Sequence, residues 1–153
     1  MKIVHKKTGK LVEAVIELVE EEDWKIIAND KRFGFKWIKE KKQIVHKIRL
    51  SVEKRILGLL SIEDIPKELR LHIRLIEVNS NDIGRQKEYE NIAGCLIAFT
   101  CKQSFKKNYD GFVSLYSKTE LKRLYTEKYG FEELGMNLYT ELSNSEELIK
   151  KYL

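Results

Sequence analysis

The stretch Tyr89–Phe105, YENIAGCLIAFTCKQSF, decides the fold. It is nearly uncharged in a chain of which 35% of the residues are charged, and its apolar residues cover most of a helical circumference. Such a pattern is typical of a buried helix. Two strand-like segments flank it, Arg70–Asn79 (RLHIRLIEVN) and Gly111–Tyr116 (GFVSLY). Strand, buried helix and strand in this order predict a right-handed βαβ crossover between parallel strands.

The turn that leads into this helix, Asn79–Asn91, is polar and basic. It contains Gly84, Arg85 and Lys87 ahead of Asn91. The start of a helix presents unpaired backbone N–H groups and a partial positive charge. We therefore expect any anionic ligand to bind at this end of the buried helix.

Length and composition predict one globular domain over residues 1–153. The chain has 42% hydrophobic residues, a single proline at Pro66 and no linker rich in proline or glycine. No apolar run reaches the roughly 18–20 residues of a membrane span, so no membrane association is expected. The first residues, MKIVHKK, lack the apolar core of a signal peptide, and we expect a cytoplasmic protein.

The net charge of +5 arises from 29 basic and 24 acidic residues that are interspersed along the chain. This pattern favours a solvated charged surface over a continuous basic strip that binds nucleic-acid phosphates. A basic excess equally suits a small polyanionic ligand. We expect the segment Lys31–Lys42 to be extended. Its aromatic residues Phe33, Phe35 and Trp37 are two positions apart and would lie on one side of the segment. They form either half of a core or a platform on which nucleic-acid bases stack. We favour the core and do not expect nucleic-acid binding.

Metal binding is not expected either, because the three histidines lie far from one another and from both cysteines. Cys95 and Cys101 fall on different faces of the predicted helix, so they are interpreted as buried free thiols.

The remaining segments complete an α/β pattern. Besides the two flanking strands, we predict strands at Leu11–Val19 (which also has a helical stripe), Gln43–Ser51, Arg55–Ile62 and Gly135–Thr140. We predict further helices from the acidic run Glu20–Asp23 to Asn29, at Lys118–Lys128 and at Ser145–Tyr152. Glu63–Glu68 is expected to be a loop, and His72 and Arg74 to be exposed alternate residues of their strand.

In this order, several segments resemble the GNAT acyltransferase family over about residues 11–140. The strand RLIEV, the polar turn, the apolar helix and GFVSLYSKTELKRLYTEKYGF are similar to the family's core, and Tyr125–Phe131 resembles its aromatic-x-x-x-Gly-Phe tail. RILGLLSIED and EEEDW resemble the family's second and third strands and first helix. The resemblance implies a three-layer α/β/α sandwich whose mixed central sheet is splayed between its fourth and fifth strands.

The resemblance also implies a function: N-acetyl transfer from acetyl-CoA, without a metal, to a primary amine of an unidentified small-molecule or peptide acceptor. The cofactor would lie in the cleft between Glu77–Asn79 and Gly111–Leu115. The implied cofactor-binding residues are Val78 and Asn79 for the pantetheine arm, Gly84, Arg85, Lys87, Asn91, Ile92, Ala93 and Gly94 for the pyrophosphate, and Lys118 before the next helix.

One residue matches a catalytic position of the family, and a second is a candidate general base. Tyr125 would protonate the leaving thiolate, and its alternative is to pack against the sheet with its hydroxyl hydrogen-bonded. Glu77 would act as the general base, directly or through water, and its alternative is to be a polar residue on the sheet face.

The pyrophosphate loop departs from the family pattern [Gln/Arg]-x-x-Gly-x-[Gly/Ala]. With Ala93 in the last place, Glu88 takes the first place and Asn91 the place of the middle glycine. Asparagine tolerates unusual backbone angles, whereas the Glu88 carboxylate would repel a phosphate. The alternative function is therefore a catalytically inactive, GNAT-shaped CoA-binding or interaction module. A homodimer is compatible with both functions.

Overall fold

The computed structural model describes all residues 1–153 and contains a mixed seven-stranded sheet with the strand order β3-β4-β5-β6-β8-β10-β9. The strands are β3 (Ala14–Leu18), β4 (Ile44–Leu50), β5 (Ile56–Ile65), β6 (Arg70–Val78), β8 (Val113–Tyr116), β10 (Asn137–Thr140) and β9 (Glu132–Leu134). Only β6 and β8 run parallel, and the helix α2 (Ile92–Lys106) connects them. The predicted crossover is confirmed.

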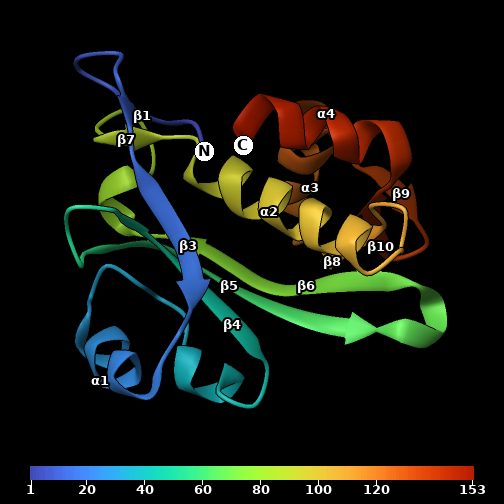
Figure 1. Cartoon of the computed structure of the whole chain (residues 1–153), viewed down its shortest axis with the longest axis horizontal. Coiled ribbons are helices and arrows are strands. Elements are labelled where there is room, and N and C mark those ends of the chain that lie inside the picture. The colour runs from blue at the N-terminus through green and yellow to red at the C-terminus, as the bar shows by residue number, and fades with distance from the viewer.

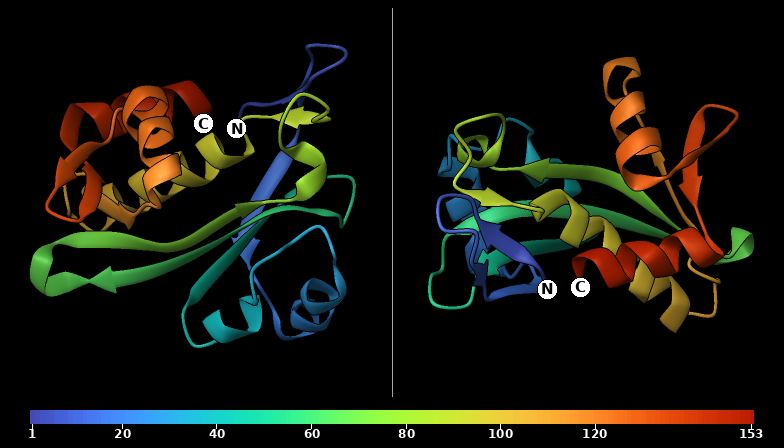
Figure 2. Two further views of the ribbon diagram at one scale, coloured as in Figure 1. Left: turned by 180° about the vertical axis from the view of Figure 1, so that it is seen from behind. Right: turned by 90° about the horizontal axis from the view of Figure 1, so that it is seen from above.

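Helices cover both faces of this sheet (Figures 1 and 2). On one face lie α2, α4 (Leu142–Tyr152) and α3 (Thr119–Arg123), which continues into a π-helical turn at Leu124–Lys128. The other face carries α1 (Glu21–Asn29) and a 3-10 turn at Trp37–Glu40. Two more 3-10 turns occupy Pro66–Glu68 and Ser80–Asp82. The layers are those of an α/β/α sandwich, as predicted.

A second, smaller sheet has the order β2-β1-β7 and lies beside the start of α2 (Figure 1). Its strands are β1 (Ile3–His5), β2 (Leu11–Val12) and β7 (Tyr89–Glu90). Because Tyr89 and Glu90 pair with β1, α2 begins at Ile92 rather than at Tyr89. No helix of the chain is both long and apolar enough to cross a membrane.

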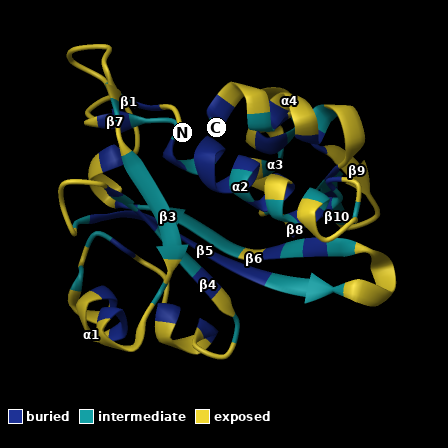
Figure 3. Cartoon of the chain, viewed as in Figure 1, coloured by how far each residue is buried: buried dark blue, intermediate teal, exposed yellow.

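The core has one large and one small part. A cluster of 23 buried residues fills the space between the sheet and α2, α3 and α4, and one of 7 lies under α1 (Figure 3). The helix α2 is buried nearly all round, as its sequence indicated. Its Cys95 and Cys101 are free thiols with 0% exposure, and burial raises their pKa values to about 11 and about 12.

The sheet splits at Arg74. Ser61 of β5 pairs with Leu75, whereas the next residue, Ile62, pairs with Ile73, so Arg74 is an extra residue that forms a β-bulge in β6. The pairing of β6 with β8 also ends at Ile73. A bulge bends a strand and increases its twist, and beyond it the edge of β6 that faced β8 has no partner strand. The splay between β6 and β8 confirms the predicted architecture.

The segment Lys31–Lys42 is not extended, contrary to the prediction. It bends and forms the 3-10 turn, because Phe33 and Trp37 turn into the core under α1, where they are 8% and 2% exposed. Phe35 stays 43% exposed, so the three aromatic side chains form no stacking platform. The preferred interpretation, half of a core, is confirmed for Phe33 and Trp37.

Other boundaries differ from the predictions in smaller ways. β5 continues through the predicted loop as far as Ile65, and the short strands β1, β7 and β9 were not predicted. The strand predicted at Leu11–Val19 is present but is interrupted at Glu13. His72 is half-buried rather than exposed, because its Nδ1 lies 2.8 Å from Ser114 Oγ on β8.

Candidate active site

A cavity of about 170 Å³ lies where β6 and β8 separate. The bulge of β6, the end of β8, the start of α3 and the loop that carries Phe35 enclose it. Its lining residues are Phe35, Ile73, Arg74, Leu75, Ile76, Leu115, Tyr116, Ser117, Lys118, Leu121 and Tyr125. A larger depression of about 480 Å³ lies away from this cleft, over α1 and β4, and Lys47 and Asp23 on its wall pair with each other at 2.6 Å.

Tyr125 lines the cavity from the π-helical turn. Its ring packs against the rings of Tyr129 and Phe131, with centroids 6.1 and 5.9 Å away, and the residue is 9% exposed. No other group of the chain forms a hydrogen bond with its hydroxyl. Burial raises the pKa of Tyr125, so the hydroxyl is protonated at neutral pH and available to donate.

Glu77 lies outside the lining of the cavity, although it belongs to the splayed half of β6. Its Oε2 accepts a hydrogen bond from the amide of Gly34 at 2.7 Å, and its Oε1 accepts from Trp37 Nε1 at 2.8 Å and from the amide of Phe35 at 3.3 Å. The carboxylate therefore holds the loop that brings Phe35 to the cavity.

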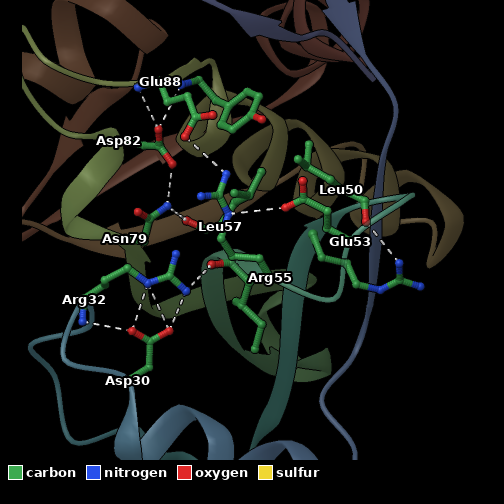
Figure 4. A network of polar contacts seen from close by, with 12 residues as sticks. Asp30, Arg32, Leu50, Glu53, Arg55, Leu57, Asn79, Asp82 and Glu88 are labelled. Carbon is green, nitrogen blue, oxygen red and sulfur yellow. Dashed lines mark hydrogen bonds and ion pairs between the residues drawn. The ribbon is translucent and has the colours of Figure 1, made fainter.

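The two residues predicted to contact the pantetheine arm differ in their surroundings. Val78 pairs with Gly58 of β5 and has no strand on its other edge. The side chain of Asn79 is fully buried, and its Nδ2 donates to the Leu57 carbonyl at 2.9 Å and to Asp82 Oδ2 at 2.6 Å (Figure 4). This side chain is occupied in organising the turn.

Asp82 completes that organisation. Its Oδ1 accepts hydrogen bonds from the backbone amides of Glu88 at 3.0 Å and Tyr89 at 2.8 Å, so the turn between β6 and α2 folds back on itself (Figure 4). The Glu88 side chain points toward Arg55, with 3.3 Å between Oε2 and Nη2. The negative charge that was expected to repel a phosphate is therefore compensated by a guanidinium.

Asn91, at the start of α2, stands where the family's pyrophosphate pattern has its middle glycine, and it has a backbone conformation that glycine adopts readily. Asn91 adopts a φ of 73°, in the left-handed region, and its Nδ2 donates to the Lys2 carbonyl at 3.0 Å. The first helical hydrogen bond runs from Cys95 N to Asn91 O at 2.9 Å. The amides of Ile92, Ala93 and Gly94 thus have no partner within the helix, and of these residues Ile92 and Gly94 are buried.

Gly94 has a packing role as well. A Cβ atom at this position would lie 2.5 Å from Cε1 of Tyr152, so the absence of a side chain lets α4 pack against the first turn of α2. The Tyr152 residue is 1% exposed, and its hydroxyl is buried without a hydrogen-bond partner.

The remaining predicted cofactor residues fall into two groups. Lys118 is exposed and lines the same cavity as Tyr125. Gly84, Arg85 and Lys87 lie in the outer part of the turn, where the Arg85 carbonyl accepts a hydrogen bond from Lys6 Nζ and Lys87 lies 3.8 Å from Glu90. These three are not part of the cavity lining.

The predicted site did not include eight residues that line the cavity: Phe35, Ile73, Arg74, Leu75, Ile76, Tyr116, Ser117 and Leu121. One signal for Arg74 was available. Leu71 and Ile73 are two positions apart, as apolar residues on one face of a strand are. Ile76 and Val78 have the same spacing, but Ile76 comes three positions after Ile73 instead of two, which indicates one inserted residue in the strand.

Comparisons with known proteins establish the fold. No family model matches the sequence, and no match was found among curated proteins. Solved structures do match. The ribosomal-protein-S18-alanine N-acetyltransferase of Escherichia coli has a TM-score of 0.64 at 11% identity, covering 85% of this chain and 94% of that chain. The spermidine/spermine N-acetyltransferase SpeG of Vibrio cholerae has a TM-score of 0.64 at 16% identity, covering 90% and 96%.

A protein assigned as a streptothricin acetyltransferase, from Bacillus anthracis and solved in complex with acetyl coenzyme A, has a TM-score of 0.65 at 12% identity. It covers 86% of this chain and 99% of its own. The chain therefore has the fold of the GNAT N-acetyltransferases over nearly its whole length.

Proposed function

We propose that the protein is an N-acetyltransferase that moves the acetyl group of acetyl-CoA to a primary amine. The observation that carries this proposal is the cavity at the splay of β6 and β8, which Tyr125 lines with a protonated, unpartnered hydroxyl. The structural neighbours are N-acetyltransferases, and one of them was solved with acetyl-CoA.

Two features of the chain fit a CoA ligand. The free edge of β6 beyond Ile73, including Val78, can pair with a pantetheine arm as with an added strand. The start of α2, with Asn91 in a left-handed conformation, offers the amides of Ile92, Ala93 and Gly94 to a pyrophosphate. Arg85 and Lys87 of the outer turn add a screened attraction for phosphate groups.

In this mechanism Tyr125 donates its proton to the departing thiolate. The neutral acceptor amine would attack the acetyl thioester, and as the carbon–sulfur bond breaks the departing thiolate would gain a proton from the phenol, while the nitrogen of the new amide loses one proton to solvent. Because burial disfavours the tyrosinate, Tyr125 must recover its proton from solvent or from the acceptor ammonium before the next turnover.

The part that we propose for Glu77 is to position the acceptor side of the cavity. A role as general base is disfavoured, because three of the roughly four lone-pair sites of its carboxylate already accept hydrogen bonds, from the amides of Gly34 and Phe35 and from Trp37 Nε1. Holding Phe35 against the cavity is the contribution that the geometry favours.

The alternative function is a GNAT-shaped module that binds CoA without catalysis. The departure of the Glu88–Ala93 segment from the family's pyrophosphate pattern favours it, because an altered loop can hold CoA without presenting its thioester for transfer. Saturable CoA binding without transfer to any amine would support this alternative.

Calorimetry with CoA, combined with a thiol-release assay on a panel of amines, tests the proposal. We expect a Kd in the micromolar range, about −8 kcal/mol. Both cysteines are 0% exposed, so the protein itself adds little background to the thiol assay. The absence of binding at millimolar CoA would contradict both functions.

A further inference from the structure

The charged groups around the cavity are unevenly distributed. Arg74 and Lys118 line it, and no aspartate or glutamate does. The nearby carboxylates are engaged: Glu77 binds the Phe35 loop, Glu40 accepts hydrogen bonds from Ser61 and Arg74, and Glu63 pairs with Arg74 at 3.7 Å. The cavity therefore offers positive charge and N–H donors but no free carboxylate.

Arg74 is held ready to bind an anion. Its Nε donates to Glu40 Oε1 at 2.9 Å, and Ser61 Oγ donates to the same oxygen at 2.9 Å, which fixes a Glu40 residue that is 5% exposed. The neighbouring guanidinium lowers the pKa of Glu40, so the pair stays charged at neutral pH. One edge of the guanidinium is thus oriented by the protein.

The rest of this guanidinium is held more loosely. The Arg74 side chain is 37% exposed, its Nη2 lies 3.5 Å from Glu40 Oε2, and its Nη1 forms a longer ion pair with Glu63 at 3.7 Å. Since arginine carries five N–H donors in a planar fork, donors of Nη1 and Nη2 remain beyond those that Glu40 accepts, and Arg74 is one of the residues that line the cavity. Such a fork matches a carboxylate in a two-point hydrogen bond.

The acceptor amine must also be neutral when it attacks. Side-chain amines such as that of lysine have a pKa of about 10.4, whereas the terminal α-amino group of a peptide chain has a pKa of about 7.7–8.0. At pH 7.5 about a third of an α-amine is neutral, compared with about 0.1% of an alkyl amine. A cavity without a free carboxylate base therefore favours an α-amine. A polyamine would in addition bring positive charges next to Arg74 and Lys118, which is unfavourable.

On the premise of the proposed function, we infer that the acceptor is an α-amine bearing a carboxylate, which Arg74 binds while the amine faces the thioester. A free α-amino acid and a peptide with an acidic first residue both carry an α-amine and a carboxylate, but only the peptide also has the low amine pKa, because the α-carboxylate of a free amino acid keeps its amine more basic. The neutral amide of the same amino acid lacks the carboxylate, and spermidine lacks both the carboxylate and the low amine pKa.

The test measures kcat/KM for acetyl transfer to glutamate, glutamate α,γ-diamide, a tripeptide beginning with glutamate, and spermidine at pH 7.5. We expect glutamate or the acidic tripeptide to exceed both the diamide and spermidine by tenfold or more. The acceptor preferred between those two identifies the source of the carboxylate, and either supports the inference. Equal or faster transfer to spermidine or the diamide overturns the inference and leaves the proposed function standing.

A paired variant separates recognition from folding. Arg74→Gln alone leaves Glu40 as an uncompensated, nearly buried charge, so it is combined with Glu40→Gln, which replaces the ion pair by a neutral hydrogen bond. The double variant should raise the KM for the carboxylate-bearing acceptor about tenfold and leave the KM for acetyl-CoA unchanged. An unchanged acceptor KM in a folded double variant overturns the inference. Loss of acetyl-CoA binding by the unmodified protein would instead remove the proposed function on which it rests.

Discussion

The indole nitrogen of Trp37 donates a 2.8 Å hydrogen bond to Oε1 of Glu77 and thereby ties the loop after α1 to the splayed half of β6. The amide of Gly34 donates to the other oxygen at 2.7 Å. Between these two contacts lies Phe35, which lines the cavity. The position of one cavity wall is therefore set by a carboxylate that does not itself face the cavity.

Replacing Glu77 by glutamine should loosen this wall. Hydrogen bonds to a charged group contribute about 1.5–3 kcal/mol, and the amide retains part of that, so we expect a loss of about 1–2 kcal/mol in the free energy of unfolding. In kinetic assays the acceptor KM should rise while the pH dependence of kcat keeps its shape. Glu132→Gln, at an exposed carboxylate bonded to Tyr139, is the matched control. Disappearance of the acidic limb of the pH profile would instead assign Glu77 the role of base.

Replacing Tyr125 by phenylalanine removes only the hydroxyl. General-acid catalysis contributes about 10²–10⁴-fold, so we expect kcat to fall about 100-fold, with the Kd for CoA within a factor of two. Tyr139→Phe, at a surface tyrosine on β10, controls for loss of a hydroxyl. Because burial raises the pKa of Tyr125, deprotonation of this residue should reduce the rate of the unmodified protein only above pH ~10. Unchanged turnover of the variant would exclude Tyr125 from the mechanism.

Asn91 can be tested with a pair of substitutions. Asn91→Gly keeps the left-handed backbone at φ 73° accessible and should bind CoA nearly as well as the unmodified protein. Asn91→Ala must adopt the same angle at a cost of about 1–2 kcal/mol, and we expect weaker CoA binding together with lower stability. Calorimetry on the two variants in parallel measures this difference, and equal affinities would show that the conformation of Asn91 does not matter for the ligand.

A methyl group at Gly94 should disturb the contact between α2 and α4. The added Cβ would lie 2.5 Å from the Tyr152 ring, which is 1% exposed and has no room to move freely. We expect Gly94→Ala to lower the free energy of unfolding by about 1–3 kcal/mol, as overpacking of a core generally does. In a double-mutant cycle with Tyr152→Leu, much of this loss should disappear. Additive effects of the two substitutions would mean that the helices adjust independently.

His46 should make the protein less stable in mild acid. Burial lowers the pKa of His46 in the folded state, so the unfolded chain binds more protons as the pH falls below about 6.5. Its Nδ1 is buried without a partner, and its ring packs edge-on against Phe99 at 4.8 Å. Urea unfolding between pH 7.5 and 5 should show falling stability, with a smaller slope in His46→Leu. An identical slope in that variant would assign the pH dependence to another group, such as His72, whose pKa burial also lowers.

Much of the fold could be predicted from local sequence patterns. The apolar circumference of α2 and the β-branched strands beside it carry enough information to define the crossover, because burial on all sides leaves few alternatives. The segment around Trp37 was not predictable in the same way. Alternating aromatic residues suit an extended strand, but the tertiary contacts of Trp37 with the core and with Glu77 override that local preference.

The cavity was predictable in part. Tyr125 and Lys118 were predicted as site residues and line the cavity, while their roles stay predictions. Leu57, Trp37 and Glu40, which bind the side chains of Asn79, Glu77 and Arg74, are more than 20 residues away in sequence, so no local pattern could show these contacts. The bulge at Arg74 left a trace in the alternation of β6, but the depth of the resulting cavity depends on side chains from four separate segments.

The loop formed by residues 31–42 is attached to β6 by side chains at two points, Trp37 to Glu77 and Glu40 to Arg74, and it carries Phe35, which lines the cavity. We therefore expect that the residues around Phe35 can be exchanged while these attachment points stay fixed. A replacement loop that keeps tryptophan and glutamate at positions 37 and 40 could dock on the same strand. On the proposed function, engineered versions of this chain could then acquire new acceptors by a change in this loop alone, without altering the strands that form the cleft.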